Sequence, residues 1–406
     1  MEEVLKLIDA KFKETNSILA MEYLRDLFVE KYGANKNIIS TYFSPGRVNL
    51  IGEHTDYNGG FVFPCAISFG VYCLIRKNDR NSVRFASLNM EFNTEVKLKD
   101  LNKPVGKEWV NYPIGVFAQF LKKGLTFYTG CDLLFYGNVP DGAGLSSSAA
   151  LEVVTGYSIN NAYGFKINTV ELAKMGQKAE HEFAGVNCGI MDQFASGMAK
   201  KDKAIFLNCD TLEYELVPVI LKGAKIVISN TNSPHKLDSG KYNERVAECK
   251  AAVEAIKPYK NINVLADISW EEFVKIQDKI ENETIRKRAR HVVSEIKRTI
   301  DAVKELKNGN IEKFGELMNG SHDSLRDDYE VTGNELDTMV EEARKIEGVI
   351  GSRMTGGGFG GCTVSIVKDE AIDKFIDQVG KNYKERTGLK PEFYVAEISD
   401  GAHKID

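Results

Sequence analysis

The sequence has no hydrophobic run long enough to cross a membrane, because none of its apolar stretches approaches the ~18 residues that a spanning helix needs. Its first residues, MEEVLKLIDAKFKE, are acidic and amphipathic, and they lack the basic region that precedes the apolar core of a secretory signal. The net charge of −5 provides no field that would attract nucleic acid or an anionic membrane. We therefore expect a cytoplasmic protein with neither nucleic acid nor membrane as a partner.

The sequence also lacks several signatures of metal and nucleotide sites. Its seven cysteines include no CxxC pair, which favours buried free thiols in a reducing compartment over disulfides or a zinc site. His181-Glu182 begins like the zinc motif HExxH, but residue 185 is glycine. No GxxxxGKS or GxxxxGKT occurs, and no HRD or DFG pair occurs, which excludes a Walker-type nucleotide site and a protein kinase.

What is present is the composition of a soluble globular protein, with 43% hydrophobic and 27% charged residues in a chain of 406, long enough for two domains. Residues 2–33 have helical spacing, and strand patterns dominate from there to about residue 231. Helical periodicity dominates after about residue 232. This division predicts an α+β protein of two lobes. We expect domains at 1–205 and 206–390, followed by a C-terminal strand and tail at 391–406.

Hydrophobic periodicity predicts the individual elements. We expect strands at 39–43, 61–77, 82–88, 94–98, 131–136, 204–210, 214–220, 224–231, 348–354, 362–368 and 393–398. We expect helices at 109–121, 149–163, 170–183, 239–257, 270–279, 282–307, 310–326, 333–346 and 371–386, and a short one around Asp192.

Residues 136–154, YGNVPDGAGLSSSAALEVV, form the most unusual local sequence. A strand leads into small residues and three consecutive serines, and a helix-forming run follows. In this arrangement backbone N–H groups and the positive end of a helix face one point, which is typical of a phosphate site. An ordinary strand–helix loop with a serine cap fits these residues equally well. We call residues 142–148 the second glycine stretch.

The first glycine stretch, residues 44–67, combines charge with apolar residues. A solvated turn would explain the charges alone, but the interleaved apolar residues indicate that the backbone turns inward between them. A partly buried loop that keeps its charges is more often a site than a spacer. The charged residues are Arg47, Glu53, His54 and Asp56, and the interleaved ones are Val48, Leu50 and Ile51.

Two later stretches each allow a functional and a structural interpretation. The third glycine stretch, GGGFGG at 356–361, matches GxGxxG, but a strand follows it where a dinucleotide site needs a helix. It is therefore either a tight hairpin or a backbone-only loop that closes over a ligand from the second lobe. The basic run RKRARH at 286–291 lies among Glu281, Glu283 and Glu295 on a predicted helix, which favours a solvated helix face over a nucleic-acid site.

Together the three glycine stretches resemble the motifs of the GHMP kinase family, which fall in this order along the chain. GRVNLIGEHTDYNGG (46–60) is similar to the galactokinase signature of that family, VPDGAGLSSSAALE to its ATP loop, and MTGGGFGGC to its third motif. The blocks CGIMDQF, SGKYNERVAEC and SHDSLRDDYEVTGNELD also resemble galactokinases. The resemblance covers nearly the whole chain. It implies a two-lobed GHMP kinase fold with a mixed-sheet N-terminal lobe, a helix-rich C-terminal lobe and an active site in the cleft between them.

The resemblance also implies roles for individual residues. Asp192 would be the catalytic base beside the C1 hydroxyl of galactose, and Arg47 would hold it ionised and offset charge on the transferring phosphoryl group. Whether Asp192 abstracts the proton or acts electrostatically stays open, because a loose phosphoryl transition state demands little of a base. The implied sugar contacts are Glu53, His54, Thr55, Asp56, Gly189 and Tyr242.

The nucleotide and its metal are implied in the same way. The second glycine stretch would bind the triphosphate of ATP, and Ser148 with Glu180 would bind Mg²⁺, whose remaining ligands are phosphate oxygens and water. Ser87 and Trp109 are candidates for the adenine pocket, with core packing or a solvated loop as the alternative for each. The residues implied to bind ATP in the second glycine stretch are Gly142, Ala143, Gly144, Leu145, Ser146, Ser147 and Ser148.

Three functions fit these motifs. The first is ATP- and Mg²⁺-dependent phosphorylation of α-D-galactose at C1, the step that commits galactose to catabolism by the Leloir pathway. The second is a related kinase acting on N-acetylgalactosamine, mevalonate or homoserine, against which the uninterrupted EHTDYNGG argues. The third is a non-catalytic galactose and ATP sensor, which would have a shortened serine-alanine segment, whereas GLSSSAA is full length. We expect the first, in a monomer whose partners are its small-molecule substrates.

Overall fold

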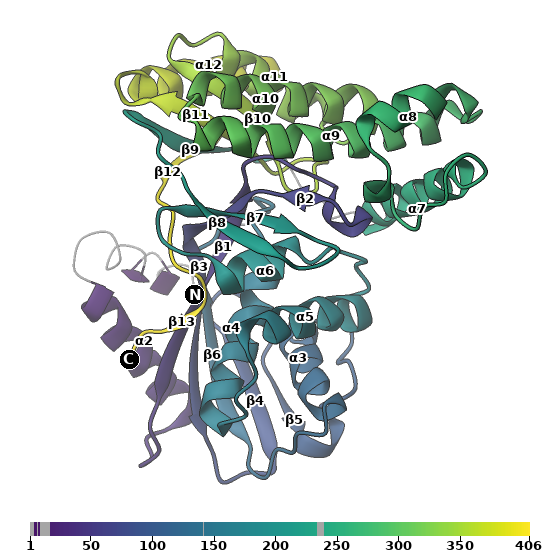
Figure 1. Ribbon diagram of the computed structural model, residues 1–406. Helices are drawn as coiled ribbons and strands as arrows, with labels where there is room; N and C mark the ends of the chain where they lie inside the picture. The colour runs from purple at the N-terminus through teal and green to yellow at the C-terminus, as the bar shows by residue number, and fades with distance from the viewer. Residues whose placement is uncertain (1–3, 6, 9–16, 141, 234–238) are drawn as a thin grey trace.

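The computed structural model describes residues 4–5, 7–8, 17–140, 142–233 and 239–406, which form two lobes (Figure 1). Residues 9–16 of the predicted N-terminal helix lie outside the described residues, and α2 (Ser17–Tyr32) accounts for its second half. No helix in the described part of the chain combines the length and the apolarity that a membrane crossing requires. The mixed α+β architecture agrees with the prediction.

A six-stranded mixed sheet forms the N-terminal lobe, in the order β13-β1-β3-β6-β4-β5. Its pairs are antiparallel except for β4 with β6, which is parallel. The strands are β1 (Ser40–Asn49), β3 (Pro64–Lys77), β4 (Ser82–Ser87), β5 (Thr94–Lys97), β6 (Cys131–Gly137) and β13 (His403–Lys404).

Alternating side chains of these strands cover the two faces of the sheet, as strand geometry requires. On β6, Leu134 and Tyr136 pack with Phe28 of α2, whereas Leu133 and Phe135 face the opposite core. That second core is built with three helices: α3 (Asn111–Lys122), α4 (Ser147–Tyr163) and α5 (Thr169–Ala179). The sheet is thus buried on both faces, and α4 follows directly from the second glycine stretch.

A smaller sheet, β2-β7-β8, and the short helix α6 (Met191–Met198) lie between the main sheet and the C-terminal lobe in Figure 1. Its strands are β2 (Phe61–Val62), β7 (Lys203–Asn208) and β8 (Tyr214–Pro218). The pairing of β2 with β7 joins the end of the first glycine stretch to a segment about 145 residues later, with Phe61 opposite Asn208. The predicted domain boundaries at 205 and 390 stay a prediction.

The C-terminal lobe is built on a four-stranded antiparallel sheet in the order β10-β11-β9-β12. One face carries α9 and α10, and the other carries α11 and α12, so both faces are buried. The strands are β9 (Ala224–Asn230), β10 (Val349–Thr355), β11 (Cys362–Lys368) and β12 (Glu392–Ala396), and the helices are α7 (Ser239–Ile256), α8 (Trp270–Ile276), α9 (Glu283–Lys307), α10 (Ile311–Ser324), α11 (Gly333–Arg344) and α12 (Ile372–Thr387).

The apolar residues of the first glycine stretch join the cores of the two lobes. Val48, Leu50 and Ile51 are fully buried and belong to one hydrophobic cluster with Ile228 of β9 and Phe314 of α10. The prediction that the backbone turns inward between the charges is therefore confirmed. The charged residues beside them are held at the seam between the lobes.

Four features differ from the predicted elements. Strand β1 continues through Gly46 and Arg47 to Asn49, although the strand was predicted only over residues 39–43. Helix α3 begins at Asn111 rather than at residue 109. The predicted helices 170–183 and 310–326 each end in a π-helical turn, at Glu180–Ala184 and Leu325–Tyr329. Strand β13 was not predicted, because two residues carry no periodic pattern.

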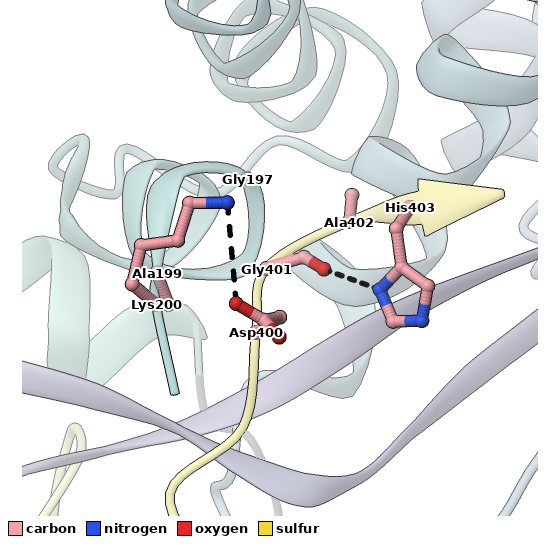
Figure 2. Close-up of a pocket in the computed structure, with 7 residues that line it drawn as sticks. All are labelled: Gly197, Ala199, Lys200, Asp400, Gly401, Ala402 and His403. Carbon is pink, nitrogen blue, oxygen red and sulfur yellow. Dashed lines mark hydrogen bonds and ion pairs between the residues drawn. The ribbon is translucent and has the colours of Figure 1, made fainter. Parts of the chain in front are cut away.

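The C-terminal segment leaves β12 and returns to the N-terminal lobe, where Lys404 of β13 lies opposite Tyr42 of β1. On the way, the backbone N–H of Gly401 donates to Ala199 O at 2.8 Å, at the C-terminal end of α6. A pocket of about 250 Å³ lies here, lined by Gly197, Ala199, Lys200, Asp400, Gly401, Ala402 and His403 (Figure 2).

Candidate active site

The three glycine stretches, far apart in the sequence, are in contact in the structure. A side chain at Gly46 would place its Cβ 2.5 Å from Leu145 O, and the next N–H, that of Arg47, donates to the same oxygen at 3.1 Å. At Gly356 a Cβ would lie 2.8 Å from Gly144 O. These distances are shorter than any Cβ tolerates, so the glycines permit the close approach. The third stretch is thus a loop from the second lobe that closes on the second stretch.

The buried Arg47 and the partly exposed Asp192 form a bidentate pair at this junction. The Nε and Nη2 atoms of Arg47 donate to the two carboxylate oxygens of Asp192, each at 2.8 Å, and Nη1 donates to Gly144 O at 3.0 Å. Burial would lower the pKa of Arg47, but the carboxylates of Asp192 and Glu53 raise it above its usual value. The Asp192 side chain is 29% exposed while that of Arg47 is 4% exposed, so the carboxylate remains accessible to a ligand.

The position of Asp192 follows from α6, because the residue lies in the first turn of that helix. Unpaired N–H groups and the helix dipole at this end favour a negative charge. Ser146 of the second glycine stretch also donates to Asp192, with its Oγ 2.6 Å from Oδ2. The carboxylate therefore touches both the first and the second glycine stretch.

The second glycine stretch leads directly into α4. Gly142, Gly144 and Ser146 have φ near +65°, the left-handed conformation, which turns the backbone sharply before the helix starts at Ser147. The Ser146 hydroxyl is used by Asp192 rather than as a cap for the helix. The Ser146 side chain therefore does not cap the first turn of α4, and a helix start after such a turn can bind a phosphate.

Ser148 and Glu180, the predicted metal ligands, are adjacent. Ser148 Oγ lies 3.2 Å from Oε1 of Glu180, which is the first residue of the π-helical turn after α5. Burial and the neighbouring Asp192 raise the pKa of Glu180 to about 7, a shift that a cation between these oxygens would oppose. A hydroxyl and a carboxylate are ligands that Mg²⁺ accepts, so the residues fit the ion. In the described part of the chain, no three His, Cys, Asp or Glu side chains cluster as a metal cage.

Sequence reasoning missed Gln193, which orients Glu180, and Glu152, which binds the same amide. The Nε2 atom of Gln193 donates to Glu180 at 2.7 Å and to Glu152 at 2.9 Å, so the residue after Asp192 links α6 to α4 and to the π-helical turn. Glu152 is fully buried, and burial and the charge of Glu180 raise its pKa well above the usual value. The signal available in the sequence was the adjacency of Gln193 to Asp192.

His54 is held in a network of aromatic side chains. It has a left-handed backbone (φ 62°), and its Nδ1 lies 2.8 Å from the hydroxyl of Tyr57, which lies 2.7 Å from that of Tyr329. The rings of His54 and Tyr242 are 5.8 Å apart. Burial lowers the pKa of His54 to about 3, so the imidazole is neutral and offers one donor and one acceptor.

Asp56 and Gly189 are in direct contact, as their predicted shared role requires. A Cβ on Gly189 would lie 1.9 Å from Oδ2 of Asp56. Burial and the charge of Asp192 raise the pKa of Asp56 to about 7. The Thr55 hydroxyl donates to the carbonyls of Gly52 at 2.9 Å and Phe61 at 2.7 Å, so this side chain holds the turn.

Glu53 links the first glycine stretch to the third. Its carboxylate is 1% exposed and accepts from the N–H of Gly356 at 2.7 Å and from the amide of Asn49 at 3.0 Å. Arg353 Nη1 approaches the same carboxylate at 3.4 Å. The side chain is therefore held by three partners at the seam.

Ser87 and Trp109 lie beside β6, the strand that leads to the second glycine stretch. The Ser87 hydroxyl accepts from the N–H groups of Asn89 and Met90, at 3.1 and 3.2 Å. The Trp109 ring packs edge-on against Phe135 at 5.7 Å, and its Nε1 donates to a backbone carbonyl at 2.8 Å. Ser87 thus closes a turn, and Trp109 packs at the edge of the core.

The basic run on α9 corrects one expectation. A solvated helix face was predicted, but Arg288, His291 and Glu295 are buried, with 2%, 0% and 0% exposure. His291 Nε2 lies 3.2 Å from Glu53 O, and Glu295 accepts from the N–H of Gly52 at 3.0 Å. These residues therefore support the first glycine stretch. The signal in the sequence was their spacing of three and four, which places them on one helix face.

Models of protein families match three segments of the chain. Residues 26–77 match the galactokinase galactose-binding signature, residues 111–200 the GHMP kinase N-terminal domain, and residues 302–385 the GHMP kinase C-terminal domain. Among curated relatives, the galactokinase of Clostridium acetobutylicum is 49% identical over 100% of both chains. That of Bacillus subtilis is 48% identical over 95% of this chain and 99% of its own.

Solved structures agree with these matches. Lactococcus lactis galactokinase, crystallised with galactose, superposes with a TM-score of 0.93 at 45% identity, covering 95% of this chain and 100% of that one. Methanococcus jannaschii mevalonate kinase superposes with a TM-score of 0.64 at 19% identity, covering 90% of this chain and 99% of that one. This is a likeness of fold alone. The sequence, the three family models and the architecture of the two lobes lead to one assignment: the chain belongs to the galactokinase family of the GHMP kinases.

Proposed function

We propose that this chain transfers the γ-phosphoryl group of ATP to the C1 hydroxyl of α-D-galactose, giving α-D-galactose 1-phosphate and ADP. The observation that carries the proposal is the Arg47–Asp192 pair, with both bonds at 2.8 Å, between the galactokinase signature and the second glycine stretch. The identity of 49% to a curated galactokinase over the full chain supports galactose as the substrate.

Asp192 is the residue that receives or stabilises the proton of the C1 hydroxyl. Arg47 fixes both oxygens of the carboxylate and places a positive charge beside them. The guanidinium, placed at the same junction, also offsets negative charge on the phosphoryl group as it is transferred. Because phosphoryl transfer has a loose transition state, positioning and charge contribute more than proton abstraction does.

The second glycine stretch binds the triphosphate through the N–H groups at the start of α4. Ser148 and Glu180 would hold Mg²⁺, which when bound neutralises charge on the phosphate oxygens. The carboxylate of Glu180 is oriented toward Ser148 by the amide of Gln193. Ser87 and Trp109, which lie beside β6, would line one side of the pocket that binds the adenine.

The sugar is recognised by His54, Asp56, Gly189 and Tyr242, with Glu53 and Thr55 holding the loop and completing the pocket. Neutral His54 and the carboxyl of Asp56 provide fixed donors and acceptors. A site built to hydrogen-bond a particular hydroxyl rejects sugars that place it elsewhere, because its polar groups are then left unpaired. This is how the axial C4 hydroxyl of galactose would be told from the equatorial one of glucose.

The test is an assay of the purified protein with ATP, Mg²⁺ and one sugar at a time, following ADP release. We expect turnover with galactose and little with glucose, N-acetylgalactosamine or arabinose. The absence of ADP release with galactose would contradict the proposal. If galactose and ATP then still bound, the chain would be a sensor. We also propose that it acts as a monomer, which light scattering at assay concentrations measures.

A further inference from the structure

Arg353 is a fully buried arginine at the seam between the lobes. It lies on β10, three residues before the third glycine stretch, and its exposure is 0%. Its Nη1 donates to the carbonyl of Asn49 at 2.9 Å and approaches the carboxylate of Glu53 at 3.4 Å. One guanidinium from the C-terminal lobe therefore contacts both ends of the segment 49–53, which leads into His54 and Asp56.

The contacts of Nη1 with Asn49 and Glu53 form a first layer, and Nε on the other side of the guanidinium begins a second layer of hydrogen bonds. Nε of Arg353 donates to the Ser321 hydroxyl at 3.1 Å, and that hydroxyl donates to Glu295. The same Glu295 oxygen accepts from the N–H of Gly52 at 3.0 Å. The segment 49–53 is thus bound at its start, at Gly52 and at its end by groups of the C-terminal lobe.

The charges in this cluster balance. Arg353 lies against Glu53, and Arg298 forms an ion pair with Glu295, so two cations face two anions. Burial would raise the pKa of Glu295, but Arg298, His291 and Arg353 lower it to about 2, so this carboxylate stays ionised. Removing one member of such a cluster leaves an unpaired buried charge, and the segment it holds must then move.

Further bonds from the same lobe hold the segment. The Thr355 hydroxyl accepts from the N–H of Asn49 at 3.0 Å, and the N–H of Gly356 donates to Glu53 at 2.7 Å. Among these groups Arg353 alone reaches both Asn49 and Ser321, and so joins the two layers. The residues that follow, 54–56, start from a backbone set by this cluster.

We propose that Arg353 is the positioning residue of the sugar pocket: through Asn49, Glu53 and the Ser321–Glu295 pair it sets the backbone that presents His54 and Asp56 to galactose. This inference rests on the proposed function. Among the described residues, Arg353 has no hydrogen bond or ion pair with the second glycine stretch. Its loss should therefore weaken galactose binding and leave ATP binding unchanged.

The test compares Arg353→Lys and Ser321→Ala with the wild-type protein. A lysine keeps the charge but lacks the several donors of a guanidinium. It therefore cannot bind Asn49 and Ser321 at once, and the two layers of hydrogen bonds are no longer joined. We expect Arg353→Lys to raise the galactose KM, and the galactose Kd measured by calorimetry without ATP, by about tenfold or more. Ser321→Ala should raise both about threefold, and the ATP KM should change less than twofold in either variant. If Arg353→Lys fails to fold, Ser321→Ala alone decides the outcome.

Arg76→Lys is the matched control. Arg76 is also buried, at 2% exposure, and pairs with Asp132 at 2.9 Å, but at the far end of the N-terminal sheet. We expect it to lower the melting temperature without changing the galactose Kd. Equal changes of the galactose and ATP constants in the Arg353 variant, or an unchanged galactose Kd, would overturn the inference. If the wild-type protein binds galactose without turnover, the proposed function fails, and the Kd comparison still tests Arg353.

Discussion

The two segments that we propose to bind the substrates offer different chemical groups. The second glycine stretch offers backbone N–H groups and hydroxyls at the start of α4, and Gly142 and Ser147 in it are exposed. The segment 53–56 instead offers charged and aromatic side chains, of which Glu53, His54 and Thr55 are at most 4% exposed. The first is held mainly within one lobe, and the second is held across the seam by α9 and β10.

This difference follows from what each loop has to recognise. A triphosphate carries the same charge in every nucleotide, so backbone groups and a helix end suffice to bind it. A sugar is told from its epimers by single hydroxyls, which requires polar side chains in fixed positions. Fixed polar side chains must be buried and fully paired, so substitutions in the sugar loop should change stability as well as affinity.

Asp192→Asn should have the largest effect, because Asp192 contacts both Ser146 of the second glycine stretch and Arg47 of the first. Asparagine keeps the shape but loses the charge that Arg47 pairs with. We expect kcat to fall by ~10²–10⁴-fold, the usual contribution of a proton-transfer group, while the galactose Kd changes little. Steady-state kinetics and calorimetry measure the two.

The control for this variant is Asp400→Asn, whose carboxylate is half exposed and lies 3.9 Å from Lys200 at the other end of α6. It should leave kcat unchanged. If Asp192→Asn keeps kcat within about tenfold of the wild type, the role given to Asp192 is wrong.

Gly189→Ala should break the sugar loop and spare the nucleotide loop. The new methyl group would lie 1.9 Å from Asp56 Oδ2, so the carboxyl must move. We expect the galactose KM to rise about 100-fold and the ATP KM to stay within about twofold, the size of effect that displacing a buried hydrogen-bonding group has. Gly156→Ala on α4, where the methyl group would lie an ordinary 3.5 Å from Leu172, is the control. A matching rise in the ATP KM would show that the loops are not independent.

The pH dependence of stability should carry a smaller signature of Asp56. Its pKa is about 7 in the folded protein against a usual value of 3.8. Between these values the folded state binds more protons than the unfolded state, so stability falls as pH rises from about 4 to 7. Without sugar, Asp56→Asn should therefore lose less free energy of unfolding between pH 5 and pH 8 than the wild type does. Denaturant titration at the two pH values measures the difference, and equal losses in both proteins would refute it.

Trp109→Phe should have the smallest effect. Phenylalanine keeps the edge-on contact with Phe135 and loses the hydrogen bond from Nε1. We expect the free energy of unfolding to fall by about 1 kcal/mol, the usual net value of one hydrogen bond, and the ATP KM to change less than about threefold. An unchanged free energy of unfolding would contradict this prediction, because the hydrogen bond from Nε1 would then contribute nothing to stability.

The sequence predicted the two lobes and most of the helices and strands. Each helix or strand has its own hydrophobic periodicity, and turn residues mark its ends. It predicted the contact between Arg47 and Asp192 only through the family resemblance, since the two residues are 145 positions apart. Prediction from the local sequence pattern failed where a segment distant in the sequence decides the secondary structure. Strand β1 continues past Gly46, where its register shifts, because β3 pairs with it on both sides, at 40–45 and at 47–49.

Helix α9 shows the same limit at the level of side chains. Its period predicted a helix, but charge pattern alone could not tell which charges are buried. Arg288 is buried because Glu248 of α7 pairs with it at 2.8 Å, and Glu295 because Gly52 and Arg298 pair with it. A charged residue enters a core only with its partner, and Glu248 and Gly52 lie outside any local window around α9.

The return of the C-terminal segment to β1 has a consequence for the order of events during synthesis. Thr41 N donates to the Asp406 side chain at 2.8 Å, a bond between residues 365 positions apart. A nascent chain that has emerged only as far as β12 has every other strand of the N-terminal sheet but lacks β13 at its edge. The β1 edge of the sheet therefore has no strand beside it until β13 is made, and an open strand edge can pair with another chain.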